Sequence, residues 1–207
     1  MLHLLVEFGI VNRQSKIDNW ELMPTTLLLT QRDVARLIDI PTAIRVARQA
    51  FVAMARGLTV MPPKMYLPLP HESDFRAMPA YLQRPAACGV KWVNVHPRNR
   101  RRGLPTVMAV LIMNDPATGV PLAVMDGTLV TKLRTAAAAA VAAQVLARPN
   151  SHVVGLVGCG AQADAQLHAL AQVRSLSRDH VWGHTPGEAR RFCARMRRQL
   201  PRVRYVP

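Results

Sequence analysis

The sequence predicts an α/β protein in which a mixed α+β domain precedes a partial domain of the βαβαβ type. The main observation is that apolar runs and helical patterns alternate from residue 151 to the end of the 207-residue chain, as in an open parallel sheet with helical crossovers. Before this region, residues 60–128 consist of short apolar runs broken by proline and glycine, which is typical of an antiparallel or mixed sheet. An alanine-rich helical pattern joins the two regions.

The N-terminal region is predicted to contain an atypical leader and two helices. Residues 1–22 differ in character from the rest of the chain and lack the basic lead and cleavage site of a signal peptide. We therefore expect a non-native leader that results from an upstream start codon. Thr30 and Asp33 have the spacing of a capping box, which predicts the start of a helix. Apolar residues at helical spacing predict a second helix from Pro41 to a stop at Gly57.

Five apolar runs predict the strands of the first domain, and one long helix predicts the connection to the second. The runs are MYLPL, RAMPAYL, ACGVKWVNVH, TVMAVLIMND and PLAVMDG. The helix is TLVTKLRTAAAAAVAAQVLA, whose alanine content suits a packed helix better than a membrane span. The predicted division is therefore a leader (1–22), a first domain (23–128), a connecting helix (129–150) and a second domain (151–207).

Composition favours a globular protein of a reducing compartment. Half of the residues are hydrophobic, and Cys88, Cys159 and Cys193 have no paired spacing, so we expect no disulfide, no metal site and a cytoplasmic location. The formal net charge is +15, and nearly all of the positive charge is arginine, concentrated at 98–102 and in the last twenty residues or so. Because few stacking aromatics are interleaved with these arginines, a solvated helix face is favoured over nucleic-acid binding.

The segment VVGLVGCGAQADAQLHAL contains the pattern G-x-G-x-x-G/A at Gly158, Gly160 and Ala163. The first glycine permits a tight turn, the second lets backbone approach a pyrophosphate, and the alanine keeps the helix close to the sheet. Free N–H groups at the helix start, around Ala161 and Gln162, favour phosphate charge. Because the pattern follows an apolar strand and opens a helix, it predicts a Rossmann dinucleotide site in preference to a structural turn.

The sequence VWGHT, after the second predicted strand of this domain, bears on the choice of cofactor. An acidic residue at the end of that strand would hold the ribose 2′-hydroxyl of NAD, but Gly183 occupies the position. His184, Thr185 and the nearby Arg190 and Arg191 are suited to a 2′-phosphate. We expect NAD or NADP as the cofactor, with a slight preference for NADP.

The stretch GVKWVNVHPRNRRRGLPTVMAVLIMNDPATGVPLAVMDGTLVTKLRTAAAAAVAAQVLARP, followed by VGLVGCGAQA, closely resembles the ornithine cyclodeaminase/mu-crystallin family, which includes archaeal-type alanine dehydrogenases and ketimine reductases. The resemblance runs from about Met23 to the C-terminus. It implies a substrate and dimerisation domain built from the N-terminal part and a returning C-terminal segment, with a Rossmann domain between them. It also implies hydride transfer at the α-carbon of a small amino or imino acid, and a homodimer if the protein is complete. No apolar run reaches the length of a membrane span without a charge, so we expect no association with a membrane.

The resemblance further implies roles for individual residues. Lys64 in PPKMY and Lys91 in GVKWVN match basic positions that hold the substrate carboxylate. Thr106 in GLPTVM and Arg134 in KLRTAA match positions at the cofactor phosphates and the substrate. Ala161 and Gln162 match the phosphate turn.

Each of these assignments has a plainer alternative. Lys91 lies in a run that predicts a half-buried strand, where its ammonium either reaches outward to solvent or meets an anion. Arg134, near the start of an apolar helix, either faces solvent or gathers an anion. Thr106 fits a strand, and His96 is better interpreted as a loop histidine than as a proton carrier.

The catalytic aspartate of the family lies in the second half of the Rossmann domain and has no counterpart in this sequence, so the resemblance implies a truncated form with impaired activity. Three interpretations stay open. The protein is a truncated amino-acid oxidoreductase or cyclodeaminase, a non-catalytic nucleotide-binding protein of the mu-crystallin kind, or a basic protein associated with nucleic acid. GLPTV and MDGT resemble the dehydrogenase and reductase branch more than ornithine cyclodeaminase proper.

Overall fold

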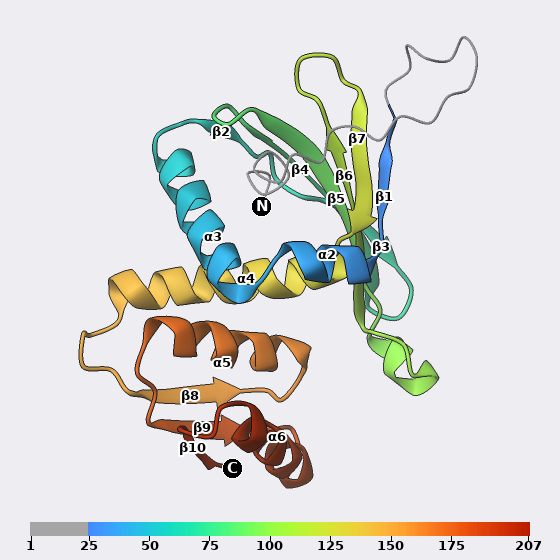
Figure 1. Cartoon of the computed structure of the whole chain (residues 1–207). Coiled ribbons are helices and arrows are strands. Elements are labelled where there is room, and N and C mark those ends of the chain that lie inside the picture. The colour runs from blue at the N-terminus through green and yellow to red at the C-terminus, as the bar shows by residue number, and fades with distance from the viewer. Residues whose placement is uncertain (1–24) are drawn as a thin grey trace. The chain divides into compact units, whose positions relative to one another are not determined.

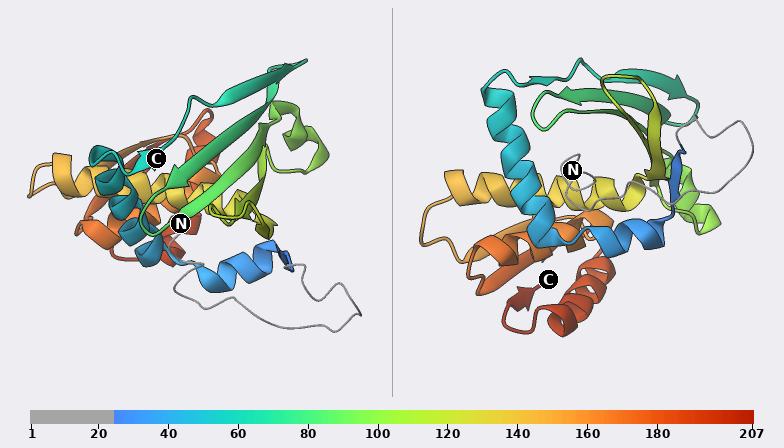
Figure 2. Two further views of the ribbon diagram at one scale, coloured as in Figure 1. Left: turned by 90° about the horizontal axis from the view of Figure 1, so that it is seen from above. Right: turned by 45° about the horizontal axis from the view of Figure 1, so that its top comes forward.

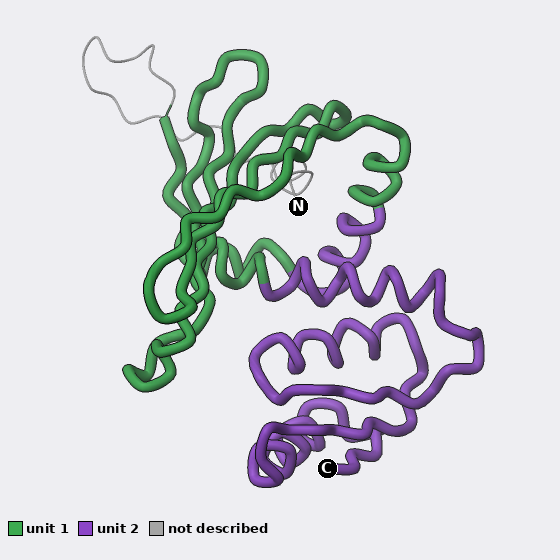
Figure 3. The backbone as a smooth tube through the Cα atoms, turned by 180° about the vertical axis from the view of Figure 1, so that it is seen from behind, with its two compact units in different colours: residues 1–38, 49–131 green, residues 39–48, 132–207 purple. Residues whose placement is uncertain are grey.

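The computed structural model describes residues 25–207, which form two compact units (Figures 1 and 3). The described part of unit 1 runs over residues 25–38 and 49–131, and the remaining described residues form unit 2. The predicted leader over residues 1–22 lies outside the described residues.

Unit 1 is built on a seven-stranded mixed sheet (Figure 2). The strand order is β1-β7-β6-β5-β4-β2, and β3 also pairs with β4. β1 runs parallel to β7, and the other pairs are antiparallel. The strands are β1 (Leu27–Leu29), β2 (Thr59–Val60), β3 (Met65–Leu69), β4 (Ser73–Leu82), β5 (Ala87–Val95), β6 (Val107–Asn114) and β7 (Pro121–Asp126). The mixed sheet is the one that the sequence predicts, but β1 and β2 were not anticipated.

One face of this sheet is covered and carries the core of unit 1. Helix α2 (Gln31–Leu37) begins with the predicted capping box, in which the N–H of Thr30 donates to Asp33 and the N–H of Asp33 donates to the Thr30 hydroxyl. The Thr30 hydroxyl also donates to the Asp33 carboxylate, and this hydrogen bond, with that from the Thr30 N–H, lowers the pKa of Asp33. Val34 of α2 belongs to the same buried cluster as Leu111 and Met125. We call the side of the sheet that bears these two residues the covered face, and the other side the open face.

Two long helices, α3 (Ile40–Ala55) and α4 (Thr128–Leu146), are each divided between the two units. The N–H of Thr42 in the first turn of α3 donates to Asp39 at 2.8 Å, and the predicted stop at Gly57 has a φ of +69°. Between β5 and β6 the chain forms a short 3-10 helix, η1 (Pro97–Arg102), where the sequence indicated only a turn.

α4 has the length and composition of a membrane span, and it is the one such helix among residues 25–207. This is weak evidence, because the core helix of a globular protein has the same properties. Ala136, Ala137 and Ala140 are fully buried, as in a packed helix. In unit 2, Arg174 donates to the carbonyl oxygens at the C-terminal end of α4, including that of Ala143 at 2.8 Å, which satisfies groups that have no partner within the helix.

Unit 2 contains the predicted βαβαβ series. Its elements are β8 (Val153–Val157), α5 (Ala161–Val173), β9 (Arg178–Trp182), α6 (Pro186–Gln199) and β10 (Arg204–Val206). The three strands are parallel, in the order β10-β9-β8. Leu167, Phe192 and Met196 lie in its core, together with one carboxylate, that of Asp179, which has no solvent exposure. The opposite side of this sheet leaves Val157 and Trp182 exposed.

Candidate functional site

The glycine turn of unit 2 joins β8 to α5. Gly158 has a φ of +102°, a conformation that other residues rarely adopt, and its N–H donates to the Trp182 carbonyl at 2.8 Å. Gly160 is the N-cap of α5 and has an extended backbone that any residue can adopt. A Cβ added at Gly160 would meet no atom within 4 Å. The protein itself therefore gives no steric reason for Gly160, whereas close approach of a ligand would give one.

The first turn of α5 is open to an anion. Gly160 forms no side-chain cap, and Ala161 and Gln162 are exposed, so the N–H groups here lack the usual protein acceptor. Ala163 is buried in the core of unit 2, where a small residue lets the helix lie close to the sheet. The acidic residue of this turn, Asp164, has Lys132 at 3.8 Å and Arg195 at 3.9 Å, which reduces its repulsion of a phosphate.

Gly183, which takes the place of the expected acid after β9, is tightly enclosed. A Cβ at this position would lie 2.9 Å from the backbone nitrogen of Ala189, 3.0 Å from the carbonyl oxygen of Thr185 and 3.1 Å from the sulfur of Cys159. Two of these atoms are backbone and cannot swing aside. The start of α6 therefore packs too closely for any side chain at position 183.

Polar groups surround the start of α6 instead. Thr185 is the N-cap and accepts a hydrogen bond from the N–H of Glu188, and His184 beside it is exposed. A Cβ at Gly187 would lie 3.3 Å from a terminal nitrogen of Arg191, so the guanidinium of Arg191 folds back over the first turn of the helix. A cation at a helix N-terminus opposes the helix dipole, and a bound anion would remove this cost.

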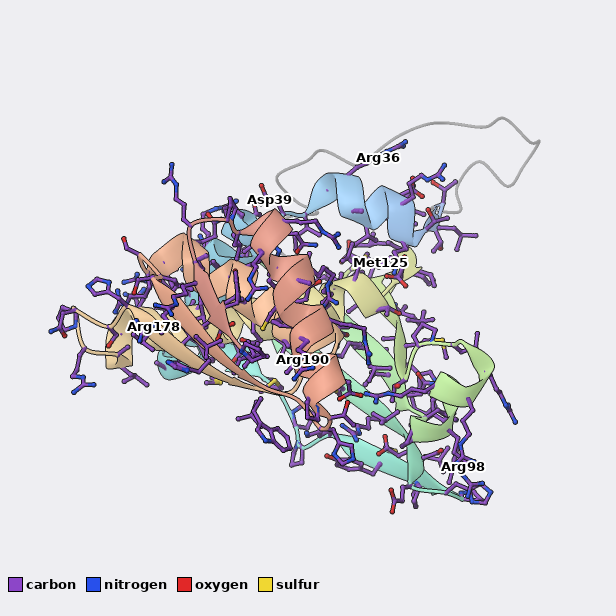
Figure 4. The ribbon with its side chains drawn as sticks, turned by 90° about the horizontal axis from the view of Figure 1, so that it is seen from below. Arg36, Asp39, Arg98, Met125, Arg178 and Arg190 are labelled. Atoms are coloured by element: carbon purple, nitrogen blue, oxygen red, sulfur yellow. The ribbon has the colours of Figure 1, made fainter. Side chains whose placement is uncertain are left out.

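The other arginines of α6 lie at different distances along the helix. Arg190 directly precedes Arg191 and is also exposed (Figure 4). The arginines of the last turn of the helix, Arg197 and Arg198, lie at the other end.

The covered face of the sheet in unit 1 carries the two predicted lysines. Lys91 lies in β5 opposite Met78 of β4, and Lys64 directly precedes β3, whose first residue, Met65, pairs with Ala77. Because neighbouring residues of a strand alternate in direction and paired residues share a face, Lys64 and Lys91 are both placed on the covered face, on either side of Met78. Lys91 is only 8% exposed.

Three further residues of β3 and β4 belong to this region, and the sequence did not single them out. Arg76 donates to both carboxylate oxygens of Asp74, each at 2.8 Å. The Arg76 guanidinium lies 5.1 Å from the ring centre of Tyr66, and the Lys64 ammonium lies 5.6 Å from the same ring. The hydrogen bonds with Asp74 raise the pKa of Arg76, which therefore stays charged.

The loop after β5 places Thr106 and His96 side by side through the backbone. The N–H of His96 donates to the Thr106 carbonyl at 2.8 Å. The His96 ring is 3.1 Å from the Asn94 amide and packs edge-on against Phe75. His96 thus has structural contacts, in keeping with its interpretation as a loop residue.

Arg134 is the seventh residue of α4, beyond the first turn in which a helix dipole attracts an anion. Its side chain is exposed, although burial lowers the pKa of its guanidinium. The guanidinium stays protonated in spite of this shift. Arg134 lies in unit 2 and the two lysines lie in unit 1.

The described residues contain no group of three or more His, Cys, Asp or Glu that could hold a metal ion. The two units offer two kinds of binding group. Unit 2 presents backbone N–H groups and an open glycine turn for phosphates, and unit 1 presents two cations and an ion pair on one face of a sheet.

The profile of the ornithine cyclodeaminase/mu-crystallin family matches residues 24–205. The chain belongs to this family. It is 48% identical to an alanine dehydrogenase of Archaeoglobus fulgidus over 167 residues, which are 81% of this chain and 51% of that enzyme. It is 35% identical to a Δ1-pyrroline-2-carboxylate/Δ1-piperideine-2-carboxylate reductase of Azospirillum brasilense, over 83% of this chain and 54% of the reductase.

Solved structures of this family have the same fold. The Δ1-pyrroline-2-carboxylate reductase of Thermococcus litoralis, in complex with NADH and L-proline, superposes with a TM-score of 0.83 at 36% identity, over 87% of this chain and 57% of that one. An archaeal alanine dehydrogenase dimer with bound NAD gives 0.81 at 44% identity, over 87% and 55%. The chain thus spans about half the length of the relatives it matches.

Proposed function

We propose that this member of the family binds NAD(P) at the glycine turn of unit 2 and takes part in hydride transfer at the α-carbon of a small amino or imino acid. The observation that carries the proposal is the open turn at Gly160, where the backbone geometry is ordinary and an added Cβ would meet no atom of the described residues within 4 Å. The solved relatives with NADH or NAD support it. The nicotinamide would accept or supply the hydride, and the protein would bind and orient the substrate.

The substrate carboxylate is assigned to Lys64 and Lys91. Lys91 shares the covered face with Lys64, on either side of Met78, so two cations project from neighbouring strands at one place, as recognition of a carboxylate requires. Tyr66 helps to hold Lys64, since a cation near an aromatic ring is attracted to its face. Arg134, Thr106 and Gln162 are proposed to complete the contacts with substrate and phosphates.

For the finer choice of cofactor, we propose a preference for NADP. Position 183 has no room for the carboxylate that would bind a ribose 2′-hydroxyl. The guanidinium of Arg191, the hydroxyl of Thr185 and the ring of His184 offer a cation and hydrogen-bonding groups for a 2′-phosphate at the same end of β9.

Titration of the protein with NADPH and with NADH, followed by nucleotide fluorescence, tests both proposals. We expect NADPH to bind about tenfold more tightly than NADH, and Arg191→Ala to remove most of that difference, since a charge-assisted hydrogen bond of this kind contributes roughly 1.5–3 kcal/mol. Arg198→Ala, in the last turn of the same helix, is the matched control and should change neither affinity. Equal affinities for the two nucleotides would contradict the preference, and binding of neither would contradict the function.

We also propose that the open face of the sheet in unit 1 binds a second copy of this chain. Met65, Trp92 and Val110 of this face are exposed, and the cross-strand pairs Val110–Trp92 and Trp92–Ala77 join them into one surface. Contiguous apolar surface of this kind is typical of a protein interface. The dimer formed by the related alanine dehydrogenase supports the choice of partner.

Sedimentation velocity measures this association directly. We expect the wild-type protein to sediment as a dimer and Val110→Glu to sediment as a monomer, because a second carboxylate beside Asp126 would lose its hydration in the interface without gaining a partner. Leu146→Glu, at an exposed apolar position at the end of α4, should stay dimeric. A monomeric wild type, or a dimeric Val110→Glu, would rule out this face as the interface.

A further inference from the structure

We infer that the substrate carries one carboxylate and no second charged group, because Arg76 and Asp74 neutralise each other beside the lysines of the covered face. The inference rests on the proposed function, in which Lys64 and Lys91 bind the α-carboxylate. The ion pair of Arg76 and Asp74 would then determine which substrates the site accepts.

Arg76 lies close enough to this site to contact a substrate. It pairs with Tyr66 on one side and with Val93 on the other, and Lys91 is two residues from Val93 along β5. Such diagonal neighbours on one face of a sheet are about 7–8 Å apart, which long side chains span. Arg76 and Lys91 thus project from adjacent strands on the same face, and the side chain of Arg76 is 29% exposed.

The guanidinium of Arg76 is already engaged. Its Nε and one terminal nitrogen donate to the two oxygens of Asp74, both at 2.8 Å, which is the paired geometry in which arginine binds a carboxylate most strongly. The central carbon of the guanidinium lies over the ring of Tyr66, 5.1 Å from the ring centre. Asp74, 20% exposed, stands in the place that a second substrate carboxylate would take.

The ion pair of Asp74 and Arg76 also disfavours substrates that have a cationic side chain. Asp74 is the one acid among the strand residues that the register places on the covered face, since Asp126 pairs with Val110 on the open face. A substrate with a terminal ammonium would therefore have to displace Arg76 from Asp74. A dicarboxylate would have to displace Asp74 from Arg76. Small substrates with an uncharged side chain can bind without breaking the ion pair of Asp74 and Arg76.

Comparison of L-proline with L-aspartate as ligands, in the presence of NADPH, tests the inference in the full chain by saturation-transfer NMR and isothermal titration. Wild type should bind L-proline and bind L-aspartate at least about tenfold more weakly. Asp74→Asn keeps the size of the side chain and frees the charge of Arg76, so it should improve the affinity for L-aspartate about tenfold and leave that for L-proline within about twofold. The double variant Asp74→Asn/Arg76→Leu should lose this gain, since the freed cation is gone. Circular dichroism confirms that each variant is folded.

The outcomes separate the inference from the function on which it rests. If wild type binds L-aspartate as well as L-proline, or if Asp74→Asn leaves the preference unchanged, the inference is wrong and the function stands. If wild type binds neither amino acid, or if it binds L-proline and Lys91→Met does not weaken that affinity, the assignment of the lysines fails and the inference fails with it.

Discussion

Replacement of Gly160 by alanine is expected to lower the affinity for NAD(P)H by tenfold or more while leaving the protein folded. The backbone at Gly160 is extended and a Cβ there meets no atom within 4 Å, so the substitution fits the free protein at a cost of about 1 kcal/mol or less. The new methyl group would instead hold a pyrophosphate away from the N–H groups of the turn, and each such hydrogen bond to a charged group contributes about 1.5–3 kcal/mol. Fluorescence titration measures the affinity, and thermal unfolding measures the stability.

Gly155 supplies the matched control for this experiment. It lies in β8, five residues before Gly160, and a Cβ at Gly155 would also have no neighbour within 4 Å. Gly155→Ala should therefore bind nucleotide as the wild type does. An unchanged affinity in Gly160→Ala would show that the turn does not hold the pyrophosphate.

Replacement of Asp179 by asparagine is expected to stabilise the protein at neutral pH much more than in acid. The side chain of Asp179 has no solvent exposure, and neither carboxylate oxygen has a hydrogen-bond partner among the described residues. Burial raises the pKa of Asp179 to about 6 from an ordinary 3.8. Tyr205 lies opposite it on β10, and burial and the nearby carboxylate raise the pKa of Tyr205 to about 12.

The sign of the effect is set by the direction of the shift. Because the folded state holds the proton of Asp179 to a higher pH than the unfolded state, stability is fully present below about pH 4 and is lost as the pH rises through about 6. The total loss is about 3 kcal/mol at 1.36 kcal/mol per pH unit, and about 2 kcal/mol of it falls between pH 4.5 and pH 7.5.

Urea denaturation across this range measures the free energy of unfolding of both proteins. The wild type should lose about 2 kcal/mol relative to Asp179→Asn between pH 4.5 and pH 7.5. Asp179→Val, which removes the polar group altogether, should match the asparagine variant in its pH dependence. Parallel curves for wild type and Asp179→Asn would contradict the assignment of a buried, uncompensated carboxylate.

The parts of the fold that depend on local pattern could be predicted from the sequence. The strand, glycine turn and helix of unit 2 are recognisable because each residue of the motif acts on its neighbours, and Thr30 and Asp33 cap α2 for the same reason. β1 and β2 were not predicted, because they are only three and two residues long. They form strands by pairing with β7 and β4. No local pattern specifies such a strand.

The candidate site divides in the same way. The turn residues and the tightly enclosed Gly183 stand at fixed positions of a motif, whereas Asp74, Arg76 and Tyr66 come together only through the register of β3 and β4. An Asp and an Arg two residues apart in a strand share a face. This spacing was the one feature of the sequence that could have predicted the ion pair of Asp74 and Arg76. The burial of Asp179 was also not predictable, since charged residues usually lie at the surface.

The enclosure of Gly183 also limits how this protein could change its nucleotide preference. In many dehydrogenases, a single substitution by aspartate at the end of the second strand of the nucleotide-binding domain would be the simplest first step toward a preference for NAD. Here that exchange would push against the backbone of Ala189 and Thr185, so the first turn of α6 would have to move before an acid could be useful. A laboratory selection for NADH use should thus yield insertions or substitutions in residues 185–189 before any at position 183.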